Sequence, residues 1–200
     1  NTYGADAFRW YMYTAGPPGE PKRFSVDLVG QMFRSFWLTL WNTYSFFVTY
    51  ANLDEFNPRE DEMIPLEERP ALDRWILSEL HALVREVTDR LEAFDATGAA
   101  RRLRDFVVDD LSNWYVRRNR KRFWKSKDAA DQASAYHALH EALTTTAKLI
   151  APLAPFLAEM LYRNLVLNVD ADAPPSVHLA DWPEADEVRI DPELMRDMAA

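Results

Sequence analysis

The chemically most distinctive part of this sequence is a run of basic and aromatic residues around position 120. It comprises Arg117, Arg118, Arg120, Lys121, Arg122 and Trp124. A guanidinium presents a planar fork of N–H donors that matches a phosphate group and also stacks on a nucleobase. An aromatic ring beside it offers a surface on which an unpaired base can stack. These residue types together predict binding of a structured RNA, with all six side chains as candidate contacts.

The spacing predicts that the candidates continue the face of one helix. Positions three, four, seven and eight after Trp114 carry Arg117, Arg118, Lys121 and Arg122. Residues three or four apart are neighbours on a helix surface. Trp114 and Tyr115 close an apolar stripe, so we expect them to support the cationic surface from within the protein rather than to contact RNA themselves.

The charge distribution supports the same hypothesis despite an acidic chain. The net charge is −9, yet residues 101–127 contain ten basic and three acidic residues. A local basic stripe can bind a polyanion because its field and contacts act locally. The alternative is structural, since cations near a helix C-terminus interact with the helix dipole and can pair with nearby acids, here Asp105, Asp109 and Asp110.

Other combinations of side chains that could do chemistry are sparse. His137 and His140 are three residues apart and could bind a metal with Glu141, but one such pair is a weak signal, and ordinary surface or core histidines explain it better. The chain contains no Cys and only five Gly, so neither a thiolate metal site nor a glycine-rich phosphate loop is present. We therefore expect no catalytic residue and no metal ligand, and a binding module rather than a catalyst.

The elements that must position these residues are helices. Apolar residues recur every three or four positions through each expected long helix, and Pro, Gly or capping residues separate them. The expected long helices span residues 26–50, 70–94, 95–124, 129–150 and 155–167. Shorter helices are expected at 6–13 and from Asp191 onward, and a short strand at Ser176–Leu179. Short connections favour antiparallel neighbours, so the predicted fold is an all-α antiparallel bundle of about five long helices.

One long apolar stretch, residues 28–53, could be mistaken for a membrane span. It contains Gln31, Arg34, Asn42 and Asn52, whereas a spanning helix needs about 20 predominantly apolar residues. We therefore expect a buried helix of the bundle and no association with a membrane.

Several segments together resemble class I aminoacyl-tRNA synthetases, specifically the isoleucine enzymes. The segments that carry the resemblance are Asn113–Trp124, Tyr3–Tyr11, Phe36–Asn42, Asp73–Ser78, Ile150–Glu159 and Ser176–Leu179 with Trp182-Pro183. They come in the order found in that family and span nearly the whole chain. The run Trp114-Tyr115-Val116-Arg117-Arg118 resembles the isoleucine enzymes more than the valine or leucine enzymes.

The resemblance implies a division of the chain and a function for it. Residues 1–24 would end the catalytic and stem-contact region, residues 25–169 would form the anticodon-binding helical bundle, and residues 170–200 would close the bundle and begin the next element. The chain would bind tRNA, expected to be tRNA(Ile), within a cytoplasmic and monomeric ligase that attaches isoleucine to tRNA with ATP.

The resemblance also implies which parts lie elsewhere. The histidine- and lysine-containing signatures of class I enzymes are not in this sequence, so we expect the fragment to be inactive alone and to hold no cofactor. ATP with Mg²⁺ would bind to a preceding part of a longer chain, and zinc to a following one. Two alternatives stay open, namely the same region of a valine or leucine enzyme, or a helical protein–protein scaffold.

Overall fold

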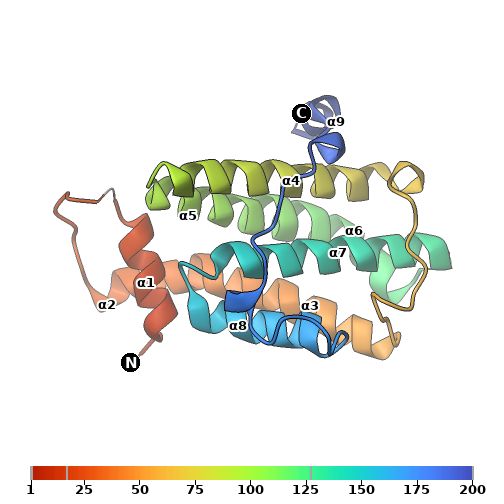
Figure 1. Cartoon of the computed structure of the whole chain (residues 1–200), viewed down its shortest axis with the longest axis horizontal. Coiled ribbons are helices and arrows are strands. Elements are labelled where there is room, and N and C mark those ends of the chain that lie inside the picture. Colours follow the sequence, from red (N-terminus) through yellow and green to blue (C-terminus); the bar gives the residue numbers. More distant parts are fainter. Residues whose placement is uncertain (1, 17, 127, 200) are drawn as a thin grey trace.

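The computed structural model describes residues 2–16, 18–126 and 128–199, and within them every regular element is helical (Figure 1). Lys127, the last residue of the basic segment, therefore lies outside the described part. The α-helices are α1 (Ala5–Thr14), α2 (Val26–Met32), α3 (Leu38–Leu53), α4 (Ala71–Glu92), α5 (Ala96–Asp105), α6 (Arg117–Trp124), α7 (Ala129–Ile150), α8 (Pro155–Tyr162) and α9 (Pro192–Ala199). The π-helical segments are η1 (Phe33–Trp37), η3 (Phe106–Val116) and η4 (Arg163–Leu167). The 3₁₀ turns are η2 (Leu66–Glu68), η5 (Val177–Leu179) and η6 (Glu187–Arg189).

The predicted bundle of five long helices is confirmed over the described residues. Three of these helices pass without a break between α and π geometry, as α2–η1–α3, α5–η3–α6 and α8–η4, and the other two are α4 and α7. Figure 1 shows that each long helix runs opposite to the one before it in the chain, with α1 across one end. A π turn adds one residue to the repeat and is often found at functional sites. The longest such stretch, η3, leads directly into α6.

Capping side chains determine where several helices begin. The Ser25 hydroxyl accepts a hydrogen bond from the Leu28 N–H, and the Asp95 carboxylate accepts one from the Gly98 N–H. Asp128 accepts from both Ala130 and Asp131 at the start of α7. Each acceptor satisfies amides that have no partner within the first helical turn. These caps place the helix starts within one residue of the positions that the sequence predicts.

The core lies between α4 and its neighbours α5, η3 and α7, with α3 covering η3 and α7. Its members are apolar side chains without solvent exposure, among them Leu80, Leu83, Leu103, Phe106, Leu111, Leu139 and Leu143. The apolar stretch 28–53 packs into this core through Phe36, Leu40 and Phe47. Among the described helices, none combines the length and the apolar character that crossing a bilayer requires.

The predicted strand at Ser176–Leu179 is wrong, because this segment forms the 3₁₀ turn η5. The Ser176 hydroxyl accepts from the His178 N–H, and the Leu179 N–H donates to the Ser176 carbonyl. The Val177 N–H donates to a group outside the turn, the Glu159 carboxylate, at 3.0 Å. The backbone is therefore paired locally and with α8, and no neighbouring strand is needed.

The last part of the described chain folds back onto α4, where α9 packs (Figure 1). The His81 ring accepts a hydrogen bond from the Asp186 N–H at 3.1 Å, and the Ser78 hydroxyl accepts one from the Asp191 N–H at 2.7 Å. Arg189 makes a two-point ion pair with Glu141 on α7, at 2.6 and 3.1 Å. The C-terminal segment is thereby joined to two of the core helices.

Candidate nucleic-acid interface

Helix α6 divides into a cationic exposed face and a buried face. Arg117, Arg118, Arg120, Lys121 and Trp124 are exposed, whereas Asn119 and Phe123 are buried. Phe123 packs edge-on against Phe46 of α3 and Tyr136 of α7. Because the buried face is anchored to two other long helices, the exposed face is presented at a defined orientation. We call Arg117, Arg118, Arg120, Lys121 and Trp124 the α6 face.

Trp114 supports the α6 face through a cation–π contact. The Arg118 guanidinium carbon lies 3.9 Å from the centre of the Trp114 ring. Trp114 is half-buried and meets Trp75 of α4 edge-on, with ring centres 6.4 Å apart. A guanidinium held over an indole keeps its N–H edge free for other partners while losing part of its rotational freedom. Trp114 therefore lies where the sequence places a supporting residue.

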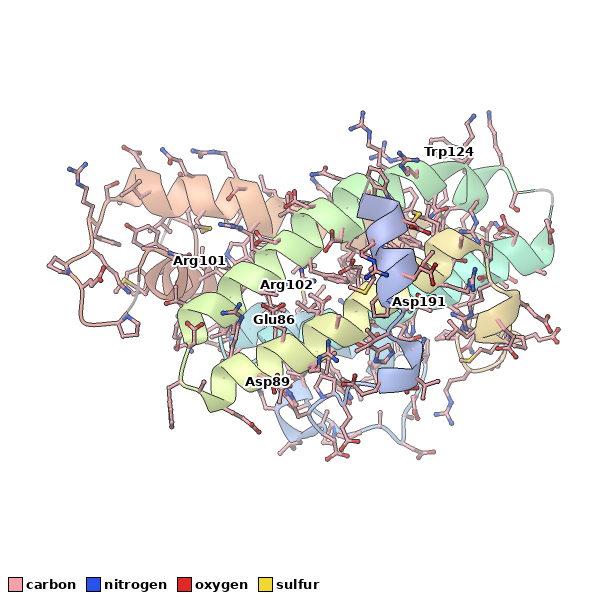
Figure 2. All side chains as sticks on the ribbon, turned by 90° about the horizontal axis from the view of Figure 1, so that it is seen from above. Glu86, Asp89, Arg101, Arg102, Trp124 and Asp191 are labelled. Carbon is pink, nitrogen blue, oxygen red and sulfur yellow. The ribbon has the colours of Figure 1, made fainter. Side chains whose placement is uncertain are left out.

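Trp124 lies at the end of the α6 face and keeps 47% of its surface exposed. Its ring meets Tyr50 of α3 edge-on, with ring centres 6.1 Å apart. Figure 2 shows Trp124 at the outer edge of α6. A large apolar side chain that is half open to solvent, next to arginines, provides a flat surface on which a base can stack.

Within the basic stretch 101–127, two arginines of α5, Arg102 and Arg104, are paired with acids, whereas the cations of the α6 face are open to solvent. Arg102 on α5 forms ion pairs with Glu79, Glu86 and Asp110, and Figure 2 shows it between α4 and α5 beside Glu86. In contrast, none of the four cations of the α6 face forms an ion pair with a described residue. The structural alternative therefore explains Arg102 and Arg104 of α5, but not the four cations of the α6 face.

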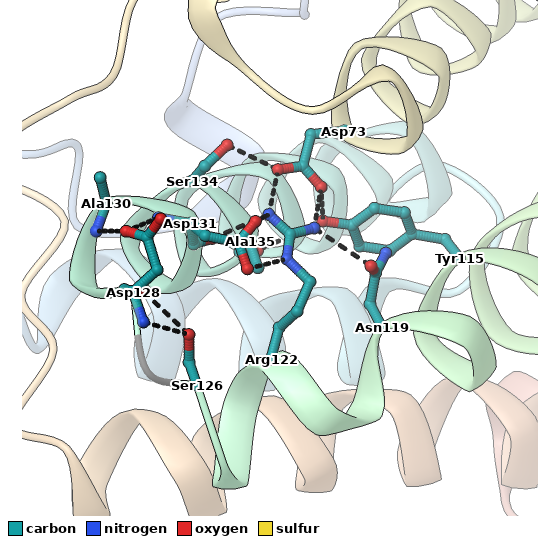
Figure 3. Close-up of polar contacts among 10 residues, drawn as sticks. All are labelled: Asp73, Tyr115, Asn119, Arg122, Ser126, Asp128, Ala130, Asp131, Ser134 and Ala135. Carbon is teal, nitrogen blue, oxygen red and sulfur yellow. Dashed lines mark hydrogen bonds and ion pairs between the residues drawn. The ribbon is translucent and has the colours of Figure 1, made fainter.

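The prediction that Arg122 faces outward is wrong, because its guanidinium points into the bundle (Figure 3). Two of its nitrogens bond the two carboxylate oxygens of Asp73 at 2.6 and 2.7 Å. Asp131 accepts a further bond at 3.0 Å, and Asn119 another at 3.1 Å. The side chain is 15% exposed, so Arg122 ties α6 to α4 and α7 instead of offering a charge to solvent.

Helix geometry explains the error. Eight residues along an α-helix advance by about 800°, which leaves Arg122 about 80° away from Trp114, whereas Lys121 lies only about 20° away on the other side. The eighth position thus rotates toward the buried side of the continuous η3–α6 helix, where Tyr115 and Asn119 lie. A spacing of seven is a better guide to a shared face than a spacing of eight.

Asp73 is the centre of this buried network, although its residue type and spacing did not mark it as a candidate site residue. It has no solvent exposure and also accepts hydrogen bonds from the Tyr115 hydroxyl at 2.8 Å and the Ser134 hydroxyl at 2.5 Å. Burial and the Asp73 charge raise the pKa of Tyr115 well above its usual value, so this phenol stays a donor. One signal was nevertheless present in the sequence. Asp73 lies three residues before Ile76 and four before Leu77, so an acidic residue falls within an apolar stripe.

The Asp73 contact also keeps Arg122 charged. Burial alone would lower the pKa of the guanidinium, but hydrogen bonds with Asp73 and the charge of that carboxylate raise it above its ordinary value. A buried ion pair of this kind needs its remaining donors and acceptors satisfied, which Asn119, Asp131 and Ser134 do here. The network therefore positions the helix that carries the α6 face.

Two of the three residues considered as a metal site, His140 and Glu141, are engaged in other contacts. His140 makes a 2.9 Å hydrogen bond with the Leu165 carbonyl, and Glu141 is paired with Arg189. Across the described residues, no group of three or more His, Cys, Asp or Glu side chains could hold a metal ion.

Comparison with known families and proteins gives consistent matches. The family model described as the anticodon-binding domain of tRNA ligase matches residues 73–200. The isoleucine–tRNA ligase of Thermus thermophilus is 55% identical over 99% of this chain and 19% of its own length. That of Dehalococcoides mccartyi strain CBDB1 is 59% identical over 96% of this chain and 19% of its own length. The chain thus spans about one fifth of the length of these relatives.

Two solved structures share the fold at low sequence identity. The Agrobacterium radiobacter K84 agnB2 LeuRS–tRNA–LeuAMS ternary complex matches with a TM-score of 0.68 and 20% identity, over 95% of this chain and 20% of that one. Free Mycobacterium tuberculosis methionyl-tRNA synthetase matches with a TM-score of 0.58 and 19% identity, over 94% of this chain and 39% of that one. At such identities the likeness concerns the arrangement of helices alone.

Proposed function

Because the chain belongs to the anticodon-binding domain family of tRNA ligases, we propose that it is the tRNA-binding part of an isoleucine–tRNA ligase and that the α6 face contacts the RNA. The observation that carries this proposal is the set of four exposed cations on one helical face, none paired with a described carboxylate. The chain has a net charge of −9, so a cationic surface without neutralising acids is a local feature. Such a surface attracts a polyanion such as RNA.

Isoleucine is the proposed amino acid because the relatives that match nearly the whole chain at 55% and 59% identity are isoleucine–tRNA ligases. The complete ligase would join isoleucine to tRNA(Ile) with ATP. Binding of ATP and Mg²⁺, and of zinc, would belong to parts of the longer protein outside these 200 residues. We expect that protein to be monomeric and cytoplasmic. The divisions at residues 24/25 and 169/170 stay predictions.

The α6 face would act on RNA through two kinds of contact. Arg117, Arg120 and Lys121 would neutralise backbone phosphates and so supply affinity without reading sequence. Arg118, held over Trp114, and the open ring of Trp124 would accept unstacked bases of a loop. The contribution of this face to the ligase would be binding and orientation of the substrate tRNA.

The test is a titration of tRNA(Ile) binding at several salt concentrations, with tRNA(Val) as competitor. We expect affinity to fall steeply with salt because phosphate binding releases counterions. The double variant Arg117→Ala/Arg118→Ala should lose about 1–3 kcal/mol of binding free energy and show a shallower salt slope. Fluorescence anisotropy of labelled tRNA gives both quantities.

The matched control is the double variant Arg23→Ala/Arg34→Ala, which also removes two exposed arginines but none from the α6 face. Its affinity should stay close to that of the parent chain. Equal losses in the control and in the double variant would show that only overall charge matters, and no binding at low salt would contradict the proposal. Binding without preference over tRNA(Val) would retain the RNA contact but contradict isoleucine specificity within this chain.

A further inference from the structure

Helix α3, which lies beside the helix that carries the α6 face, differs from the rest of the chain in charge. From Phe33 to Leu53, through η1 and α3, the sequence contains no Asp or Glu, although the chain has 32 acidic residues. The only charged residue in this range is Arg34. Carboxylates repel a polyanion, so a surface without them next to the exposed cations of α6 is accessible to RNA.

Aromatic contacts fix how α3 lies against α6. Phe46 meets Phe123 edge-on, with ring centres 5.1 Å apart, and Tyr50 meets Trp124 with ring centres 6.1 Å apart. The two long helices run in the same direction, because each runs opposite to α4 (Figure 1). The second half of α3 is therefore level with α6.

Two polar side chains of α3, Asn42 and Thr49, are exposed beside this contact. Relative to Phe46, Asn42 is rotated by about 40° and Thr49 by about 60° in the same sense. The buried Thr43 and Phe47 are rotated in the opposite sense. Asn42 and Thr49 are about 10 Å apart along the helix axis. We call these two residues the α3 strip.

The α6 face lies on the same side of the helix pair as the α3 strip. Relative to Phe123, Arg120 is rotated by about 60° and Trp124 by about 100°, in the sense opposite to that of the α3 strip. The buried Asn119 is rotated by about 40° the other way. When two helices run in the same direction and face each other, opposite rotations lead to the same side of the pair. The α3 strip and the α6 face therefore form one surface.

Carboxylates lie at the two ends of this surface, and neither α3 nor α6 contains one. At one end, the exposed Asp109 is eight residues before Arg117, or about 12 Å along the helix axis. At the other end, Asp54 and Glu55 follow the last residue of α3. Asp54 accepts hydrogen bonds from two side chains of α7. A nucleic-acid strand can thus lie along both helices between these acids.

The hydroxyl of Thr49 can accept a further hydrogen bond but has no hydrogen left to donate. It donates to the Ser45 carbonyl at 2.7 Å, so only its oxygen is available to a partner. Phosphate oxygens are acceptors too and offer no hydrogen. In an RNA backbone the donor is the ribose 2′-hydroxyl, which DNA lacks. Asn42 adds an amide, which both donates and accepts.

We propose that the α3 strip binds ribose 2′-hydroxyls of the RNA strand whose phosphates are held by the α6 face. Thr49 is an acceptor in this arrangement, and Asn42 is both donor and acceptor. The inference rests on the proposed function and adds to it a preference for RNA over DNA. The cations of α6 supply affinity for either nucleic acid, since both contain phosphates. The neutral side chains of α3 supply the distinction.

The experiment measures binding of the chain to two forms of the anticodon stem-loop of tRNA(Ile), one entirely ribose and one with 2′-deoxy nucleotides in the loop. Fluorescence anisotropy gives Kd at several salt concentrations. We expect the parent chain to bind the ribose form about five- to tenfold more tightly, which corresponds to one or two net hydrogen bonds. The salt dependence should be the same for both forms, because their phosphates are identical.

Two variants test the α3 strip. Thr49→Val keeps the shape of the side chain and removes the acceptor, and Asn42→Ala removes the amide. Both positions are exposed, so both variants should fold. Each should weaken binding of the ribose form about three- to tenfold and leave both the Kd of the deoxy form and the salt slope unchanged.

The controls separate this effect from loss of charge and from loss of any exposed polar group. Arg117→Ala/Arg118→Ala should weaken binding of both forms and make the salt slope shallower. Asn168→Ala, at an exposed asparagine that follows η4, is the matched control for Asn42→Ala. It should bind both forms like the parent chain.

Two results would overturn the assignment of the α3 strip while leaving the α6 face in place. The first is equal binding of the two forms by the parent chain, or a parent-like Kd for the ribose form in both α3 variants. The second is an equal loss on both forms in Thr49→Val, because the partner would then not be a 2′-hydroxyl. Failure of the proposed function is distinguishable, since neither form would then bind in a salt-dependent way, and the inference would be overturned with it.

Discussion

Arg122 and Asp73 form a buried ion pair that joins the end of the α5–η3–α6 helix to the first turn of α4. The carboxylate accepts from Arg122, Tyr115 and Ser134, which come from three different elements. Removing one partner of such a pair leaves the other buried and uncompensated, and this costs far more than the pair itself contributes. At the residue scale, this pair controls both the stability of the bundle and the orientation of the α6 face.

Arg122→Ala should lower the free energy of unfolding by about 3–5 kcal/mol, because Asp73 stays buried without its cation. Urea denaturation followed by circular dichroism measures the change. Arg120→Ala is the matched control, since Arg120 is exposed two residues away on the same helix, and its stability should change by no more than about 0.5 kcal/mol. Similar losses in both variants would contradict a structural role specific to Arg122.

At the element scale, the start of α5 depends on one side chain. The Asp95 carboxylate accepts from the Gly98 N–H at 2.8 Å and pairs with Arg90 at 2.9 Å. The hydrogen bond from Gly98 and the contact with the charged Arg90 lower the pKa of Asp95, and they outweigh the opposite effect of partial desolvation. The cap marks the sharp reversal between α4 and the α5–η3–α6 helix, which carries the α6 face at its other end.

Asp95→Ala should destabilise the chain by about 1 kcal/mol, the usual contribution of an N-cap. The Gly98 amide should also lose protection in hydrogen exchange, which locates the effect at the start of α5. The control Asp109→Ala removes an exposed acid further along the same long helix and should change stability by no more than about 0.5 kcal/mol. Unchanged exchange at Gly98 would argue against the capping role.

At the scale of the whole molecule, Glu141 joins the C-terminal segment to the core. Burial raises the pKa of this carboxyl, but contacts with His81 and Arg189 outweigh burial and lower the pKa to about 2, from an ordinary value of 4.5. Because the folded state favours the ionised form, Glu141 contributes stability that is fully present above about pH 4.5. That contribution is lost as the pH falls toward 2.

Glu141→Gln should therefore show a smaller loss of stability between pH 6 and pH 3 than the parent chain, by on the order of 2 kcal/mol. Urea unfolding at the two pH values gives the difference. Glu92→Gln, at an exposed position, is the control and should follow the parent chain. Identical pH profiles for the parent chain and Glu141→Gln would contradict the assigned ion pair with Arg189.

The sequence alone determined most of the secondary structure and the location of the basic segment. Apolar spacing, N-cap residues and prolines are local signals, and a helix is a local structure whose hydrogen bonds span four residues. The expected ranges 129–150 and 155–167 coincide with α7 and with α8–η4, and the other three long helices differ by up to three residues at their ends. Trp114 lies against Arg118 and Tyr115 is buried for the same reason, since both end a stripe whose period is visible in the sequence.

Only the tertiary structure decided which cations remain available. Arg122 meets Asp73 across 49 residues of chain, and no local pattern records that partner. The segment Ser176–Leu179 has a β-like composition. It nevertheless forms a turn, because the Val177 N–H donates to the carboxylate of Glu159 on α8 and not to a neighbouring strand. Helices follow from neighbouring residues, whereas the pairing of buried charges depends on which helices pack together.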